Sequence, residues 1–188
     1  MKTETVTMSR DTDDASLQQA IDETITIVPY DPAWPLRFEA ERARLVELFR
    51  GQLPVQHIGS TAVPGMPAKP VIDCMAAVAS MDVADRDVER LCADGYTTSA
   101  EFNRTLGDRR WLMRHAAGRR THHLHLVLHE SPHLTDALRF RDALRADGEL
   151  AKRYAELKQR LAAELGGDRE AYTAAKAAFI AAALRNQS

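Results

Sequence analysis

Two short segments of this sequence carry side chains suited to phosphate chemistry. Gly59, Ser60 and Thr61 follow a short apolar run at 55–58. Asp73 lies just inside the next apolar run along the chain. A glycine lets the backbone approach a phosphate closely, while N–H groups and hydroxyls donate hydrogen bonds to it. A carboxylate is a hard oxygen ligand for Mg²⁺, which proteins usually share with substrate phosphates. The pattern therefore predicts a site for a triphosphate and its metal ion; the alternative is a proline-rich connection between two strands.

A second group of chemically active side chains lies in segment 121–129, which reads Thr-His-His-Leu-His-Leu-Val-Leu-His. Because side chains alternate between the two faces of a strand, His123 and His125 are predicted to share one face. The leucines occupy the other face, which should pack in the core, so both histidines would face Asp73. Two imidazoles and a carboxylate could bind a transition metal. The alternative is a pair of hydrogen-bonding histidines in a polar cleft.

The elements that must position these residues alternate between strands and helices. Apolar or alternating runs at 25–28, 55–58 and 71–79 predict strands, and the spacing over 83–93 predicts a helix. Ala117 and Gly118 are typical of a hairpin tip before the histidine-rich strand. From Ser131 onward, apolar residues recur at helical spacing to the end of the chain. The expected fold class is therefore α/β (α+β), a small mixed sheet followed by a helical C-terminal region.

Composition limits the class of protein. The chain has 188 residues, of which 45% are hydrophobic and 28% charged, which is typical of a soluble globular protein. The net charge of −2 gives no general attraction to nucleic acid or to an anionic membrane. Cys74 and Cys92 form neither a disulfide framework nor a zinc motif, which favours a cytoplasmic location. The sequence has no long apolar run or basic leader, so we expect neither a membrane span nor export.

Residues 1–20 differ in character from the rest of the chain. They are polar, rich in Thr, Asp and Ser, and their acidic residues outnumber Lys2 and Arg10. Low apolar content with like charges predicts a disordered acidic tail. Residues 21–188 are predicted to form a single domain.

Segments 55–73 and 120–125 together resemble the signature of the GrpB family. The matching residues read His-Ile-Gly-Ser-Thr-Ala-Val-Pro-Gly from His57, then Ala-Lys-Pro-Val-Ile-Asp ending at Asp73, and later Arg-Thr-His-His-Leu-His. The resemblance extends over about residues 28–183. GrpB proteins are similar to the nucleotidyltransferase superfamily, whose members carry a Gly-Ser pair and then a strand with paired acids. The resemblance thus implies a nucleotidyltransferase-like mixed sheet.

The resemblance also implies a role for each candidate residue. Phosphates would be held by the Gly-Ser turn and neutralised by basic side chains, and a divalent metal would be bound near the carboxylate and the histidines. The phosphate-binding residues would be Gly59, Ser60, Thr61 and Lys69 with Arg114 or Arg120. The catalytic and metal-binding residues would be Asp73, His123 and His125, one histidine acting as a metal ligand and the other as a general base. The metal would be Mg²⁺, with Mn²⁺ or Zn²⁺ as alternatives.

One position departs from the pattern of catalytic nucleotidyltransferases. Their second acid usually stands two residues after the first, where this chain has Met75. A thioether binds Mg²⁺ poorly, so two-metal catalysis is not expected here. Two other hypotheses therefore stay open, namely a non-catalytic module that binds a nucleotide or stabilises a partner, and a metal-dependent hydrolase.

The partners implied are a nucleotide and an unidentified small-molecule or protein acceptor, with no nucleic acid and no membrane. GrpB proteins have no settled activity, although some are fused to dephospho-CoA kinase. The sequence does not indicate the oligomeric state. Lys158 and Lys176 interrupt apolar helical patterns near the C-terminus. We expect them to be surface lysines with buried stems, a phosphate contact being the less favoured alternative.

Overall fold

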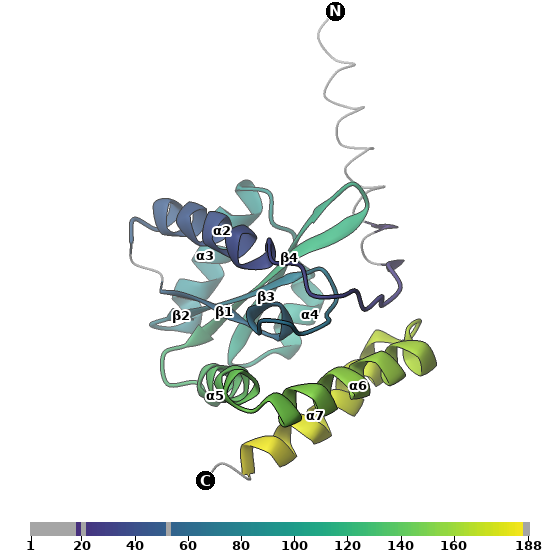
Figure 1. Ribbon diagram of the computed structural model, residues 1–188. Helices are drawn as coiled ribbons and strands as arrows, with labels where there is room; N and C mark the ends of the chain where they lie inside the picture. Colours follow the sequence, from purple (N-terminus) through teal and green to yellow (C-terminus); the bar gives the residue numbers. More distant parts are fainter. Residues whose placement is uncertain (1–17, 20–21, 52–53, 186–188) are drawn as a thin grey trace, which may run out of the picture.

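A four-stranded mixed sheet forms the centre of the protein in a computed structural model that describes residues 18–19, 22–51 and 54–185. The strands are β1 (Val55–Ile58), β2 (Ile72–Val78), β3 (Arg109–Ala116) and β4 (Arg119–Leu128), in the spatial order β1-β2-β4-β3. The central strands β2 and β4 are parallel, whereas β1 and β3 run antiparallel to their neighbours. Figure 1 shows this sheet between two groups of helices. The predicted α/β class with a mixed sheet and a helical C-terminal region is confirmed.

The helices begin where the sequence supplies capping side chains. They are α2 (Trp34–Leu48), α3 (Met81–Ala93), α4 (Ala100–Thr105), α5 (Pro132–Ala146), α6 (Gly148–Leu165) and α7 (Arg169–Arg185). Ser80, Ser131 and Asp147 accept hydrogen bonds from backbone N–H groups in the first turns of α3, α5 and α6. These bonds satisfy donors that a helix start leaves unpaired.

One face of the sheet packs against α2 and α3 and forms the main core. The buried side chains of this face come from alternate positions of β2 and β4, such as Cys74, Leu124 and Leu126. Trp34 and Leu45 from α2 and Leu91 from α3 cover them, and all three are fully buried. Because alternation commits these positions to the core, the intervening residues of β2 and β4 must face the other side.

The other face carries the candidate site and lies under the C-terminal helices. Met75, Ile58 and Val127 pack against apolar residues of α5 near one end of this face. Phe140 and Leu144 of α5 then pack with Tyr154 of α6 and with α7. The last three helices therefore form a separate layer over the sheet (Figure 1).

One prediction from the sequence needs correction, and another falls mostly outside the described residues. Residues 25–28 do not form a strand: Val28 makes only an isolated antiparallel bridge to Ala68. The side chain of Ile25 instead packs with Leu161 and Tyr172 from the C-terminal helices, so its burial comes from helix contacts. Of the predicted disordered segment 1–20, only Gln18 and Gln19 are described. No helix among the described residues is both long and apolar enough to cross a membrane.

Candidate functional site

The Gly-Ser turn lies directly against the carboxylate of Asp73. Gly59 has φ +70° and ψ −169°, a conformation that essentially only glycine adopts. A Cβ atom at Gly59 would lie 2.5 Å from Oδ2 of Asp73. The antiparallel pairing of Ile58 with Asp73 brings the end of β1 to this point. The glycine therefore allows the turn at Ser60 and the strand carboxylate to share one site.

His123 holds Asp73 from the neighbouring strand. The two residues are paired in the β2–β4 register, and His123 Nδ1 lies 3.0 Å from Asp73 Oδ1. Burial raises the pKa of Asp73, but the hydrogen bond and charge of His123, with the charge of Lys69, outweigh it and lower the pKa to about 2. Burial also lowers the pKa of His123 despite the opposing effect of the carboxylate. When the His123 proton is on Nδ1, His123 donates it to the ionised Asp73.

The next pair in the same register is Met75 and His125. Met75 is buried and packs with Ile58 and Val127. The position at which a second acid would stand is therefore part of an apolar cluster that packs against α5. His125 lines the cavity above the sheet, and burial lowers its pKa to about 4. At neutral pH, His125 therefore offers an uncharged imidazole that can accept a proton.

A cavity of about 580 Å³ opens over Asp73. Its lining combines Gly59, Ser60 and Asp73 with residues of α5, α6 and α7, including Tyr154 and Lys176. Burial raises the pKa of the Tyr154 phenol, and the nearby Ser60 side chain partly offsets this rise. Since the Asp73 side chain keeps 31% of its surface exposed, its carboxylate is accessible to a ligand in this cavity.

The charge of Asp73 acts on three lysines from different segments, of which Lys176 lines the cavity itself. Burial lowers the pKa of Lys69 to about 8 and that of Lys158 to about 7, and it also lowers the pKa of Lys176. Among the described residues, Asp73 is the only carboxylate whose charge raises these pKa values. The cluster thus carries more positive than negative charge, and an added anion would stabilise the charged lysines.

Lys158 is not the surface residue that its place in the sequence suggests. Its side chain is only 2% exposed, and Nζ donates a hydrogen bond to the Pro67 carbonyl. Nζ also lies 5.0 Å from the centre of the Tyr154 ring. Lys158 therefore ties α6 to the proline-rich loop, whereas Lys176 on α7 is half-buried and lines the cavity itself. In the sequence, both lysines interrupt an apolar helical pattern. How the helices pack decides which lysine is buried and which lines the cavity.

Four of the six predicted phosphate-binding residues do not line this cavity, and one of them is Lys69, which lines a separate cavity with Glu23 and Arg119. The Thr61 side chain is buried, and its hydroxyl pairs with His57 Nε2 at 3.0 Å, so it stabilises the turn. Arg114 lies on the opposite face, where Nη2 donates to the Asp94 carbonyl. Its guanidinium also lies over the Tyr96 ring. Arg120 lies over the Trp111 ring beside the site. The β3–β4 register shifts between Arg114 and His115. Alternation alone does not predict such a shift, so it does not predict which face of the sheet the residues around the hairpin occupy.

The described residues do not contain a group of three or more His, Cys, Asp or Glu side chains placed to hold a metal ion. A zinc-type site usually takes three or four such protein ligands. One accessible carboxylate is instead suited to Mg²⁺, which binds through one or two carboxylates together with substrate phosphates.

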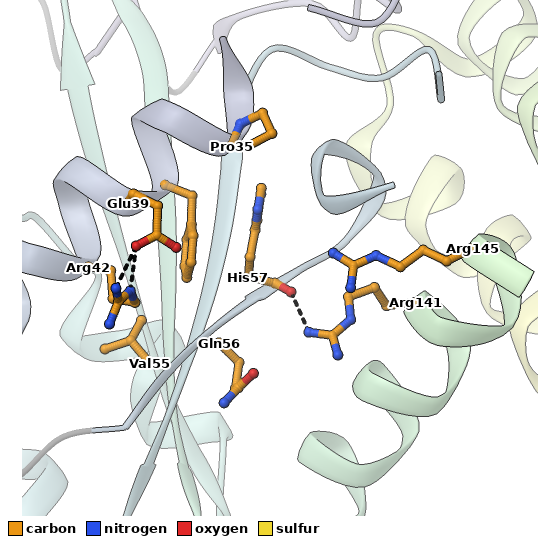
Figure 2. Close-up of a pocket in the computed structure, with 9 residues that line it drawn as sticks. Pro35, Glu39, Arg42, Val55, Gln56, His57, Arg141 and Arg145 are labelled. Carbon is orange, nitrogen blue, oxygen red and sulfur yellow. Dashed lines mark hydrogen bonds and ion pairs between the residues drawn. The ribbon is translucent and has the colours of Figure 1, made fainter. Parts of the chain in front are cut away.

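A second cavity of about 360 Å³ lies at the outer edge of β1, between α2 and α5. Figure 2 shows Arg141 and Arg145 reaching from α5 toward β1. Arg141 donates to the His57 carbonyl and Arg145 to the Ala62 carbonyl, while Arg42 pairs with Glu39. Arg141 and Arg145 therefore hold both ends of the Gly-Ser turn in place, which gives this edge a structural role in the first site.

Together, these features define the class as an α/β protein whose sheet carries a Gly-Ser turn, a strand carboxylate and a lysine-rich cavity under a helical layer. The family model described as "GrpB protein" matches residues 24–186. The chain therefore belongs to the GrpB family.

Known proteins similar to this chain include UPF0157 proteins and proteins named dephospho-CoA kinase. It is 35% identical over 163 residues to the UPF0157 protein YqkA of Bacillus subtilis, an alignment that covers 86% of this chain and 47% of YqkA. It is 32% identical to a dephospho-CoA kinase of Mycolicibacterium paratuberculosis, covering 90% of this chain and 47% of that protein. The chain thus spans about half the length of these two relatives.

A solved structure supports the fold. The crystal structure of the conserved protein GrpB from Enterococcus faecalis superimposes with a TM-score of 0.72 at 30% identity. The match covers 86% of this chain and 99% of that one. The mixed sheet and its helical layer are therefore features that this chain shares with a solved relative.

Proposed function

We propose that this protein binds the triphosphate of a nucleotide together with a divalent cation and transfers a nucleotidyl group to an acceptor. The observation that carries the proposal is the contact of the Gly59–Ser60 turn with Asp73 in a cavity that also contains Lys176. The turn and the lysine would bind phosphate oxygens, and the carboxylate would share the cation with them. The cation would neutralise charge that develops on the phosphates during transfer.

The side chains in the cavity suit the steps of such a transfer. The acceptor nucleophile would attack the α-phosphorus and pass its proton to the neutral imidazole of His125. The bond from the α-phosphorus to the bridging oxygen would then break, and pyrophosphate would leave with its charge balanced by Lys176. His123 would keep Asp73 oriented and ionised. The protein would thus act mainly by positioning and by charge neutralisation.

A second candidate is a nucleotide-binding module without catalysis, and the burial of Met75 at the place of a second acid favours it. Incubation with labelled ATP, Mg²⁺ and a panel of small-molecule acceptors separates the two candidates. Release of pyrophosphate supports transfer, whereas tight binding without release supports the module. The relative named dephospho-CoA kinase suggests including dephosphorylated coenzyme precursors in the panel.

Replacing Lys176 by glutamine should weaken binding of inorganic tripolyphosphate about tenfold, because a hydrogen bond to a charged group contributes roughly 1.5–3 kcal/mol. Isothermal titration calorimetry would measure the dissociation constant. Lys152→Gln is the matched control, since Lys152 is exposed on α6 and does not line the cavity. Equal affinity in the two variants, or no binding of tripolyphosphate to the wild-type protein, would remove the basis of the proposal.

Binding of tripolyphosphate should weaken as the pH rises from 7 to 9. The pKa of Lys158 is about 7 and that of Lys69 about 8 in the free protein, so both lose their protons over this range. The charge of a bound anion raises the pKa of each lysine, so each lysine takes up a proton on binding. This requirement lowers the affinity by up to about tenfold per pH unit for each lysine. Titrations in buffers of different ionisation enthalpy would measure the proton uptake. Uptake that is zero at pH 8 would contradict an electrostatic effect of the bound anion on these two lysines.

A further inference from the structure

The cavity over Asp73 has a second part whose chemistry the phosphate groups do not explain. Beyond Lys176, α7 presents Ala177, Ile180 and Ala181 to the cavity. Phe140 and Leu144 of α5 line it from the neighbouring helix. These side chains have no hydrogen-bonding groups and no charge, so this part cannot bind phosphate. It is continuous with the charged end, because both line the same space.

Small side chains create the room between these helices. Ala137 on α5 and Ala177 and Ala181 on α7 extend no further than Cβ, while Phe140 and Ile180 pack into the cluster behind them. The whole cavity, at about 580 Å³, falls within the usual size range of small-molecule sites, which is roughly 300–1,000 Å³. An inorganic polyphosphate would leave the apolar wall in water, whereas a ligand with an apolar organic group would cover it.

We infer that the space between α5 and α7 is the subsite for the nucleobase and that it holds the base by apolar contact without reading its identity. This inference rests on the proposed binding of a triphosphate at Asp73. The triphosphate at the Gly59–Ser60 turn directs the rest of the nucleotide toward α7, since Lys176 and Ala177 are adjacent on that helix. The polar lining residues His133 and Asp136 on α5 and Thr173 on α7 are exposed, so water can satisfy their hydrogen bonds whichever base is bound.

Because the apolar wall has no hydrogen-bonding groups, it should discriminate little between the four bases. A site rejects a competing substrate strongly only when its own buried polar groups would be left unpaired. An apolar wall instead distinguishes ligands by the area that they bury. The four common nucleoside triphosphates should therefore bind with similar affinities, with purines slightly favoured because they are larger.

Calorimetric titrations with ATP, CTP, GTP, UTP and inorganic tripolyphosphate, each with Mg²⁺, test the inference in the wild-type protein. The four nucleotides should bind within about fivefold of one another and about 10- to 100-fold more tightly than tripolyphosphate. Nucleotides that bind no more tightly than tripolyphosphate would overturn the inference and leave the phosphate site standing. A preference of 100-fold for one base would also overturn it. Failure of every polyphosphate to bind would overturn the proposed function and this inference together.

Ala181→Phe provides the complementary test, because its ring would fill the space between the helices. Nucleotide affinity should fall to that of tripolyphosphate, while the affinity for tripolyphosphate itself should not change. Ala178→Phe is the matched control, since Ala178 is exposed on the same helix and does not line the cavity. If Ala181→Phe does not fold, as judged by thermal unfolding, Ala177→Leu is the milder replacement. Equal nucleotide affinity in the cavity and control variants would contradict the subsite.

Discussion

Replacement of Asp73 by asparagine is expected to have opposite effects on binding with and without a divalent cation. With Mg²⁺ present, affinity for ATP should fall about 100-fold, because the site loses its accessible anionic ligand. Without a cation, affinity for tripolyphosphate should increase, because the carboxylate no longer repels the phosphates. Calorimetric titrations at pH 7, with Mg²⁺ or with a chelator, would measure both effects.

Opposite effects with and without the cation would distinguish a cation ligand from a residue that only stabilises the fold. A variant that is merely misfolded would lose affinity under both conditions. Glu89→Gln removes an exposed carboxylate from α3, on the other side of the sheet, and should change neither affinity. If Asp73→Asn weakened binding equally with Mg²⁺ and with chelator, Asp73 would not be the cation ligand.

Replacement of Gly59 by alanine should lower the free energy of unfolding by about 3 kcal/mol and abolish measurable nucleotide binding. The residue adopts a conformation that costs other residues roughly 1–3 kcal/mol. Its new Cβ atom would also lie 2.5 Å from Asp73 Oδ2, so the turn and the carboxylate must separate. Chemical denaturation and calorimetric titration would measure the two effects.

Gly65→Ala is the matched control for this variant. Gly65 also has a positive φ, +75°, but no atom lies within 4 Å of the position of its Cβ. The control should therefore lose about 1 kcal/mol of stability from backbone strain and retain full nucleotide affinity. A Gly59→Ala variant that binds ATP as well as Gly65→Ala does would show that contact between the turn and Asp73 is not needed.

The local part of the candidate site could be predicted from the sequence because it depends on short-range rules. Alternation in β4 predicts that His123 and His125 share a face, and the register opposite β2 places them next to Asp73 and Met75. The glycine before Ser60 indicates a turn that only a residue without Cβ can make. Both features involve neighbours along one strand or turn, so residue order is enough to predict them.

The same rules fail where a residue's surroundings come from distant segments. Arg114 lies on the far face, beside Asp94 and Tyr96, and alternation does not reveal these partners. Residues 25–28 have the pattern of a strand, yet Ile25 and Ile27 pack against α6 and α7 and the segment makes only one bridge. Burial against a helix and burial in a sheet can produce similar apolar patterns in a short run, so periodicity cannot separate them.

The sequence by itself determined the α/β class, the glycine turn, the carboxylate and the face of the two histidines. Only the tertiary structure decided that Lys158 is buried, that Lys176 lines the cavity and that an apolar space lies between α5 and α7. The physical reason is that helical periodicity specifies which face of a helix is buried but not which surface that face meets. The pKa of a lysine and the shape of a cavity depend on that surface, and it exists only once the helices pack on the sheet.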